Sequence, residues 1–108
     1  MSVTPMRLAQ TALSATMAAV YTTPASRRTQ ITEIWLANNN TTTARRVTLR
    51  AHGTAATNNI VPSIEIAANG TQIIDSSKIV LAAGQVLAAL QDVGTDVILT
   101  AYGVEEVV

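Results

Sequence analysis

Hydrophobic and polar residues alternate along several short stretches of this chain, with the period of two that is typical of β-strands. The clearest stretch is residues 44–52, where Val47, Leu49 and Ala51 share one face and polar residues occupy the other. Helical spacing of apolar residues occurs only around residues 11–20 and 81–90, and both stretches contain β-favouring or turn residues. The pattern therefore predicts an all-β protein.

Two further predicted strands, residues 29–38 and 96–104, carry large apolar side chains on both faces. On the faces turned away from the predicted core these are Ile31 and Trp35 in the first strand, and Ile98 and Tyr102 in the second. A second apolar face meets another element or another subunit. The alternative is that the two aromatic rings close the second side of the core.

Turn-forming residues interrupt the chain at a frequency that separates short strands rather than β-α-β units. They lie at residues 23–26, 38–41, 53–59, 69–70, 82–84 and 92–94. The strongest single turn is Asn69-Gly70, since both residue types tolerate the positive φ that a type I′ turn requires. We expect this turn to join residues 64–68 to residues 71–74 as a hairpin.

About eight short strands follow from these patterns. The nine candidate segments from which they are drawn lie near residues 6–13, 18–22, 28–38, 44–52, 60–67, 71–75, 79–81, 85–91 and 96–104. Their natural closure is an antiparallel β-sandwich, with a jelly roll as one form of it. We expect residues 18–108 to form a single sandwich domain, and residues 1–17 to form either an N-terminal strand or an assembly arm.

Composition agrees with one folded domain. The chain has 108 residues, of which 48% are hydrophobic and only 13% charged, too apolar for a disordered tail. Phe is absent and aromatics make up 3%, so aliphatic side chains must fill the core. No apolar run reaches the ~20 residues that span a bilayer, and we expect neither a membrane span nor a signal peptide.

Charge is balanced overall but divides between the two halves of the chain. Residues 1–54 hold six arginines and one glutamate, whereas residues 55–108 hold one lysine and six acidic residues. Such halves would attract one another between copies. The alternative, which we favour, is that the sandwich brings the halves together and neutralises them internally.

Candidate chemistry is sparse. The chain has one histidine, His52, and no cysteine, and it lacks the spacings of a metal site or a phosphate-binding loop. We therefore expect no enzyme activity, no cofactor and no metal. Paired arginines without base-stacking aromatics and with zero net charge argue against nucleic acid.

Protein interfaces are the remaining candidate sites. Rare aromatics on a second strand face often anchor interfaces, and arginines suit ion pairs to a neighbouring subunit. The predicted interface residues are Ile31, Trp35, Arg46, Arg50, Ile98 and Tyr102.

The order of the segments resembles a β-sandwich module of tailed-bacteriophage virion proteins. The segments that carry the resemblance are Tyr21–Pro24, Ile31–Asn38, Val47–Leu49, Ile79–Gln85 and Tyr102–Glu105. Two positions depart from that module, because Gln85 stands where an acidic residue is usual and Tyr102 where a serine is usual.

This resemblance implies a non-enzymatic virion protein assembled in the bacterial cytoplasm. We expect a capsid decoration or cement protein, a homo-oligomer such as a trimer, that stabilises the head by binding the major capsid protein or other virion subunits. One alternative is a structural component of the tail, collar or a fibre. Another is a carbohydrate- or receptor-binding module, since sandwiches bind sugars on strands or loops.

Overall fold

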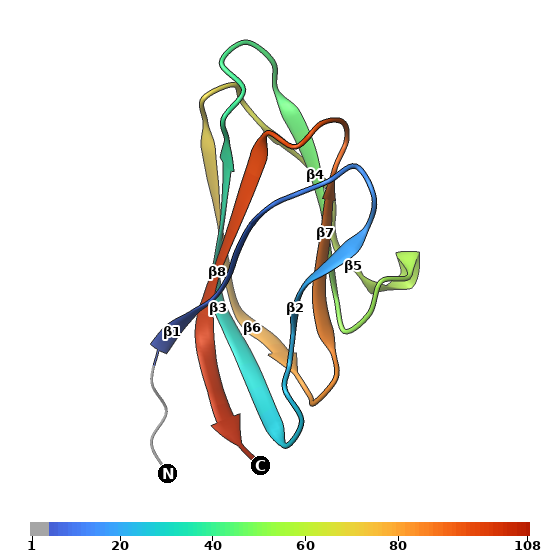
Figure 1. Cartoon of the computed structure of the whole chain (residues 1–108), viewed down its shortest axis with the longest axis vertical. Helices are drawn as coiled ribbons and strands as arrows, with labels where there is room; N and C mark the ends of the chain where they lie inside the picture. The colour runs from blue at the N-terminus through green and yellow to red at the C-terminus, as the bar shows by residue number, and fades with distance from the viewer. Residues whose placement is uncertain (1–4) are drawn as a thin grey trace.

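Eight β-strands make up most of the computed structural model, which describes residues 5–108 apart from the side chains of residues 76–78. The strands are β1 (Pro5–Ala12), β2 (Ala18–Thr22), β3 (Arg27–Asn38), β4 (Arg45–Ala51), β5 (Asn59–Ile66), β6 (Thr71–Leu81), β7 (Val86–Gln91) and β8 (Val97–Val107). A single 3₁₀ turn, η1 (Ala56–Asn58), lies between β4 and β5. The molecule is elongated, with extents of 47 × 26 × 18 Å (Figure 1).

The strands form two antiparallel four-stranded sheets that face one another. Sheet A has the order β1-β8-β3-β6, and sheet B has the order β2-β7-β4-β5. β1 pairs with β8, β2 with β7, β3 with β6 and β4 with β5. This is the order of pairing in one long antiparallel hairpin whose two arms each contain four strands. Rolling that hairpin pairs β3 with β8 and β4 with β7. This is the jelly roll, so the predicted fold class is confirmed.

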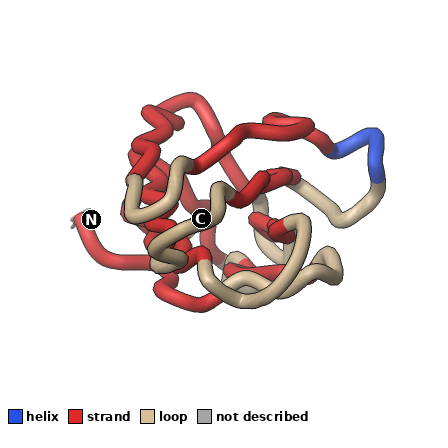
Figure 2. The backbone as a smooth tube through the Cα atoms, turned by 90° about the horizontal axis from the view of Figure 1, so that it is seen from above, coloured by secondary structure: helices blue, strands red, loops and turns tan. Residues whose placement is uncertain are grey.

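The core lies between the sheets and is aliphatic, as the absence of Phe predicts. Val47, Leu49 and Ala51 point inward from β4 and are almost completely buried. The tube seen from above shows the two layers, with η1 projecting at one side (Figure 2). The buried side chains of the core come from both sheets: Leu13, Ile31, Ile34, Leu36, Val47, Leu49, Ala51, Ile66, Leu81, Leu87, Ala89, Val97, Leu99 and Ala101.

A β-bulge in β3 corrects the predicted position of Ile31. Strict alternation puts Ile31 on the same face as Trp35, but the register of β3 shifts between Ile31 and Glu33 against both neighbouring strands. Thr32 is the extra residue, and an extra residue turns everything before it to the opposite face. Ile31 is therefore fully buried in the core and does not reach the surface.

Strand β6 is continuous where the sequence predicts two strands, at residues 71–75 and 79–81. On β3, Ile31 pairs with Ile79 and Glu33 pairs with Asp75, so residues 76–78 of β6 stand opposite the single residue Thr32. This irregularity in the strand pairing, with three residues opposite one, interrupts the apolar pattern, which explains the predicted break.

The turn at Asn69-Gly70 connects the two sheets and forms no hairpin. β5 belongs to sheet B and β6 to sheet A, so the strands on either side of the turn do not pair. Only Asn69 has a positive φ, 59°, and the Gly70 N–H donates to the carbonyl of Ala67 at 2.8 Å. One left-handed residue at the third position is the geometry of a type II turn, and the predicted type I′ hairpin is wrong.

The N-terminal part of the described chain belongs to the sandwich. β1 is the edge strand of sheet A, pairs with β8 along most of its length, and is followed by the buried Leu13. Met1 to Thr4 lie outside the described residues. The C-terminus lies at one end of the long axis of the molecule (Figure 1).

Candidate interaction surface

The predicted interface residues occupy three different places in the fold. Trp35, Ile98 and Tyr102 lie on the outer face of sheet A, because residues opposite one another on antiparallel strands project from the same face. Arg46 and Arg50 lie on the outer face of sheet B. The sixth residue, Ile31, is in the core between them.

The outer face of sheet A consists of four rows of residues that cross all four strands. Each row runs in the strand order β1, β8, β3, β6. The first row is Pro5, Val104, Gln30 and Val80, and the second row is Arg7, Tyr102, Glu33 and Asp75. The third row is Gln10, Thr100, Trp35 and Ile73, and the fourth row is Ala12, Ile98, Ala37 and Thr71. Each row joins segments that are far apart in the sequence. The face therefore exists only because the sheet topology places these four strands side by side.

Large apolar groups are exposed on this face. Trp35 and Tyr102 each retain 40% of their accessible surface, Ile73 retains 52% and Val80 retains 45%. Trp35 stands opposite Thr100 on β8, which makes Ile98 and Tyr102 its diagonal neighbours. The described strands form the two layers of the sandwich and no further layer, so these rings do not close a second core. Exposed aromatic groups of this kind are typical of binding surfaces.

Sequence reasoning missed the contribution of β6 to this surface. Ile73 and Val80 come from segments whose strand character is predicted, but their face follows only from pairing with Trp35 and Gln30. The alternation of apolar and polar residues along β6 is a weak signal, because the irregular pairing between Asp75 and Ile79 interrupts it.

A hollow of about 470 Å³ lies at one end of this same face. Val80 and Val104 form its apolar part, and Arg28, Gln30 and Glu106 form its polar part. Arg28 also makes an ion pair with Glu106, which stands opposite it on β8. The hollow continues the exposed face toward the end of the molecule where the C-terminus lies.

Opposite charges are separated across the second row. Arg7 is exposed at the β1 edge, while Glu33 and Asp75 stand opposite each other on β3 and β6. The Arg7 guanidinium donates to the side-chain carbonyl of Gln10 at 3.1 Å, and the Trp35 indole N–H donates to Glu33. The row therefore runs from positive to negative, with Tyr102 in between.

The outer face of sheet B is more polar, and its arginines are engaged within the chain. Arg46 donates to the Ser63 hydroxyl at 3.2 Å and lies 3.8 Å from a carboxylate oxygen of Glu65. Arg50 donates to the side-chain carbonyl of Asn59 at 2.6 Å and to a backbone carbonyl in the β4–β5 connection. Both side chains support the β4–β5 pair.

Ion pairs join the two oppositely charged halves of the sequence. Each pair links an arginine of the first half to an acidic residue of the second: Arg28 with Glu106, Arg45 with Asp96, and Arg46 with Glu65. The prediction that the sandwich neutralises the halves internally is confirmed for these residues.

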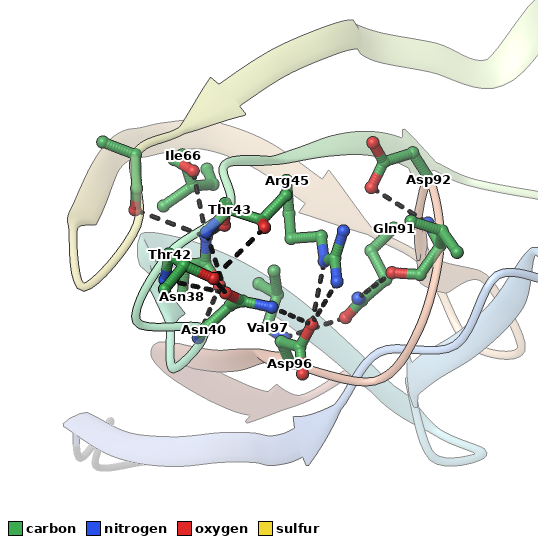
Figure 3. Close-up of polar contacts among 12 residues, drawn as sticks. Asn38, Asn40, Thr42, Thr43, Arg45, Ile66, Gln91, Asp92, Asp96 and Val97 are labelled. Atoms are coloured by element: carbon green, nitrogen blue, oxygen red, sulfur yellow. Dashed lines mark hydrogen bonds and ion pairs between the residues drawn. The ribbon is translucent and has the colours of Figure 1, made fainter.

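A polar network ties together the connections at the end of the sandwich that is far from the C-terminus (Figures 1 and 3). Asn38 is 2% exposed, and its side-chain amide donates to the backbone carbonyls of Thr43 and Ile66 at 3.0 and 3.1 Å. Its carbonyl accepts from the backbone N–H of Asn40 at 2.9 Å. One side chain thus holds the β3–β4 and β5–β6 connections together.

Asp96 lies at the centre of the other half of this network. Arg45 donates to it at 2.8 Å and the Asn40 amide at 3.2 Å. These two contacts, the arginine first, hold the pKa of the Asp96 carboxyl below its usual range. The buried Gln91 side chain accepts from the Val97 N–H at 2.8 Å and supports the same β7–β8 connection. The network closes this end of the fold.

Tyr21 closes the opposite end. Its hydroxyl, on β2 of sheet B, donates to Glu105 and lies 2.7 Å from the Thr29 hydroxyl, both on sheet A. Burial, together with the hydrogen bond to the Glu105 carboxylate, raises the pKa of Tyr21 to about 12. This contact bridges the two sheets.

No cluster of three or more potential metal-ligating side chains is present among residues 5–75 and 79–108. His52, the residue on which any Ser-His-acid chemistry would depend, is exposed at the end of β4 and lies 3.0 Å from the Val80 carbonyl. Within the described part of the chain, no helix is long and apolar enough to cross a membrane.

Comparison with solved structures relates the fold to a pilus protein. The chain is similar to a structure described as "Bacillus endospore appendages form a novel family of disulfide-linked pili", with a TM-score of 0.58 and 13% sequence identity. The similarity covers 99% of this chain and 89% of the pilus chain. At this identity the likeness concerns the fold. No protein-family model matches the sequence, and no curated protein matches it.

Proposed function

We propose that this chain is a non-enzymatic structural subunit that acts by packing against protein subunits through the outer face of sheet A. The observation that carries the proposal is the exposure of Trp35, Tyr102 and Ile73 together on one face of the sheet. Burial of exposed aromatic and aliphatic groups against another protein surface lowers the free energy, because it removes apolar surface from water.

The likeness to a pilus subunit supports a role in a protein assembly. That protein's pili are described as disulfide-linked. This chain has no cysteine, so contacts between its copies would be non-covalent. Burial of the outer face of sheet A supplies such a contact without cross-links.

Within this class, we propose a virion protein that decorates and stabilises the capsid of a tailed phage. The support is the sequence resemblance across Val20–Glu105, together with a jelly-roll fold, which is common among viral capsid proteins. Many copies, each burying on the order of 1,000 Å² at its contacts, would resist opening of a shell. The fibre or tail alternative takes its support from the pilus likeness.

The surface is tested with two double variants. Trp35→Ala with Tyr102→Ala removes the aromatic groups of sheet A, and Arg46→Ala with Arg50→Ala is the matched change on sheet B. We expect the wild type to self-associate in sedimentation velocity, the sheet A variant to lose association, and the sheet B variant to keep it. Circular dichroism checks that all three chains are folded. Association lost only in the sheet B variant would contradict the proposed surface.

Electron microscopy of the purified chain separates decoration from fibre roles. A decoration protein forms discrete oligomers, so we expect particles of one small size and no filaments. Filaments that grow with protein concentration would overturn the decoration assignment in favour of a fibre. A persistent monomer that binds glycans on an array would replace both with a carbohydrate-binding module.

A further inference from the structure

We infer that the occupant of the outer face of sheet A is the same face of a second copy, related by a twofold axis that runs parallel to the strands. This inference rests on the proposed function and specifies its partner. It is carried by the charges and the side-chain sizes on the face.

The charges on the second row are self-complementary under this axis. Rotation about an axis parallel to the strands reverses the strand order, so β1 of one copy lies over β6 of the other. Arg7 then faces Asp75 across the interface, with Glu33 adjacent to it. The twofold rotation creates this contact between Arg7 and Asp75 twice in the dimer.

The other twofold arrangement of the same faces is unfavourable. An axis running across the strands, along the second row, would place β1 over β1 and β6 over β6. Arg7 would meet Arg7, and Glu33 and Asp75 would meet the same two acids. Like charges at an interface oppose association, so the row selects the axis parallel to the strands.

Side-chain sizes match under the same axis. Trp35 on β3 faces the smaller Thr100 on β8 of the other copy, and Ile98 on β8 faces Ala37 on β3. Large groups opposite small ones allow two surfaces to interdigitate. The long Arg7 side chain accommodates the offset of about −30° at which twisted sheets pack.

The size of the face predicts a dimer that dissociates on dilution. Four strands spaced at about 4.8 Å and about eight residues at about 3.3 Å give roughly 500 Å² per copy. Two such faces reach about 1,000 Å², the low end of specific interfaces. Association should therefore depend on protein concentration.

A charge exchange between two chains tests this arrangement. One chain carries Arg7→Glu, and the other carries Glu33→Arg with Asp75→Arg. Each alone places like charges across both contacts and should sediment with the monomer mass at a concentration where the wild type has twice that mass. An equimolar mixture restores opposite charges at both contacts, and we expect it to recover the dimer mass. Arg46→Glu on sheet B is the matched control and should leave the wild-type dimer unchanged.

The outcomes separate this inference from the proposed function. Recovery of the dimer only in the mixture supports the twofold pairing, because a merely unfolded variant would not be rescued by a second one. A mixture that stays monomeric although circular dichroism shows both chains folded overturns it. If both charge variants associate like the wild type while the Trp35→Ala, Tyr102→Ala variant does not, the surface stands and the twofold arrangement is wrong. A wild type that is monomeric at every concentration overturns the pairing, whereas assembly with another protein through Trp35 would still support the proposed function.

Discussion

Asn38 shows how one polar side chain can close an end of a β-sandwich. It is the last residue of β3, is almost completely buried, and reaches carbonyls in two different connections. Buried polar groups are tolerated when their hydrogen bonds are made, and their loss leaves several partners unsatisfied at once. Replacement of this one side chain should therefore have a large effect on the stability of the fold.

Replacing Asn38 with Ala should therefore lower the free energy of unfolding by about 3 kcal/mol, since it leaves the backbone carbonyls of Thr43 and Ile66 and the Asn40 N–H without this partner. Urea denaturation measures the change. Asn39→Ala is the matched control, because Asn39 is exposed and should stay within about 0.5 kcal/mol of the wild type. Equal effects of the two substitutions would contradict the role assigned to Asn38.

Tyr21 makes the stability of the fold depend on alkaline pH. Its pKa is about 12 in the folded chain, against 10.0 for an ordinary tyrosine, so folding favours the neutral hydroxyl. The stabilisation is complete below pH 10 and is lost as the pH rises toward about 12. We expect the midpoint of thermal unfolding to fall over this range, and Tyr21→Phe to remove that part of the decrease. A profile unchanged by the substitution would show that another group titrates.

Among the strands, the bulge in β3 determines what the outer face of sheet A contains. By adding Thr32 it turns Ile31 into the core and Gln30 outward into the hollow beside Val80. Gly103 stands opposite Ile31 on β8, and a Cβ at that position would overlap the Gln30 carbonyl. The bulge and the glycine therefore belong to one close approach of two backbones.

Gly103→Ala should cost about 2 kcal/mol or more, since the overlapping atom belongs to the backbone and the strands must separate to admit the methyl group. Thermal and urea unfolding measure the loss. Val104→Ala, on the outer face one residue later, is the control and should cost less. A Gly103→Ala variant as stable as the wild type would show that the strands separate there at little cost.

How much of the architecture could be predicted from sequence depends on whether alternation is continuous. In β4 it is, and the inward face of Val47, Leu49 and Ala51 was predictable from the pattern alone. In β3 the single extra residue breaks the alternation, and the face of Ile31 was not predictable. The Asn69-Gly70 turn was identifiable, but whether it joins strands of one sheet or of two depends on long-range pairing.

The candidate surface was predictable in part, for the same reason. Trp35, Ile98 and Tyr102 were identifiable as a second apolar face of two strands, and the fold brings these strands together. Arg46 and Arg50 belong to the opposite sheet, and no local pattern reveals which sheet a strand will join. The charged row from Arg7 to Asp75 joins four strands and exists only after all of them have paired.

At the scale of the whole molecule, nested pairing makes each sheet depend on both halves of the chain. β1 covers one edge of β8, and without it the backbone groups on that side of β8 would be unpaired. An unpaired inner strand is a template for association with other chains. The N-terminal strand therefore shields this edge of β8 from pairing with other chains.

Deleting residues 1–12 should accordingly give a chain that is less stable and that aggregates in proportion to its concentration. Light scattering during thermal unfolding, compared with the full chain, measures both effects. A truncated chain that remains soluble and as stable as the full chain would show that β1 is dispensable for the fold and free to act as an arm.

The pairing of the first strand with the last also determines how the subunit responds to mechanical load. Pro5 stands opposite Val104, so a force that pulls the two chain ends apart would act on one hydrogen-bonded pair at a time and peel β1 from β8 as a zipper opens. A force applied across the outer face of sheet A would instead be shared by all four strands at once. A subunit of this design would resist a load applied through the outer face of sheet A better than a load applied at the start of β1 and the end of β8.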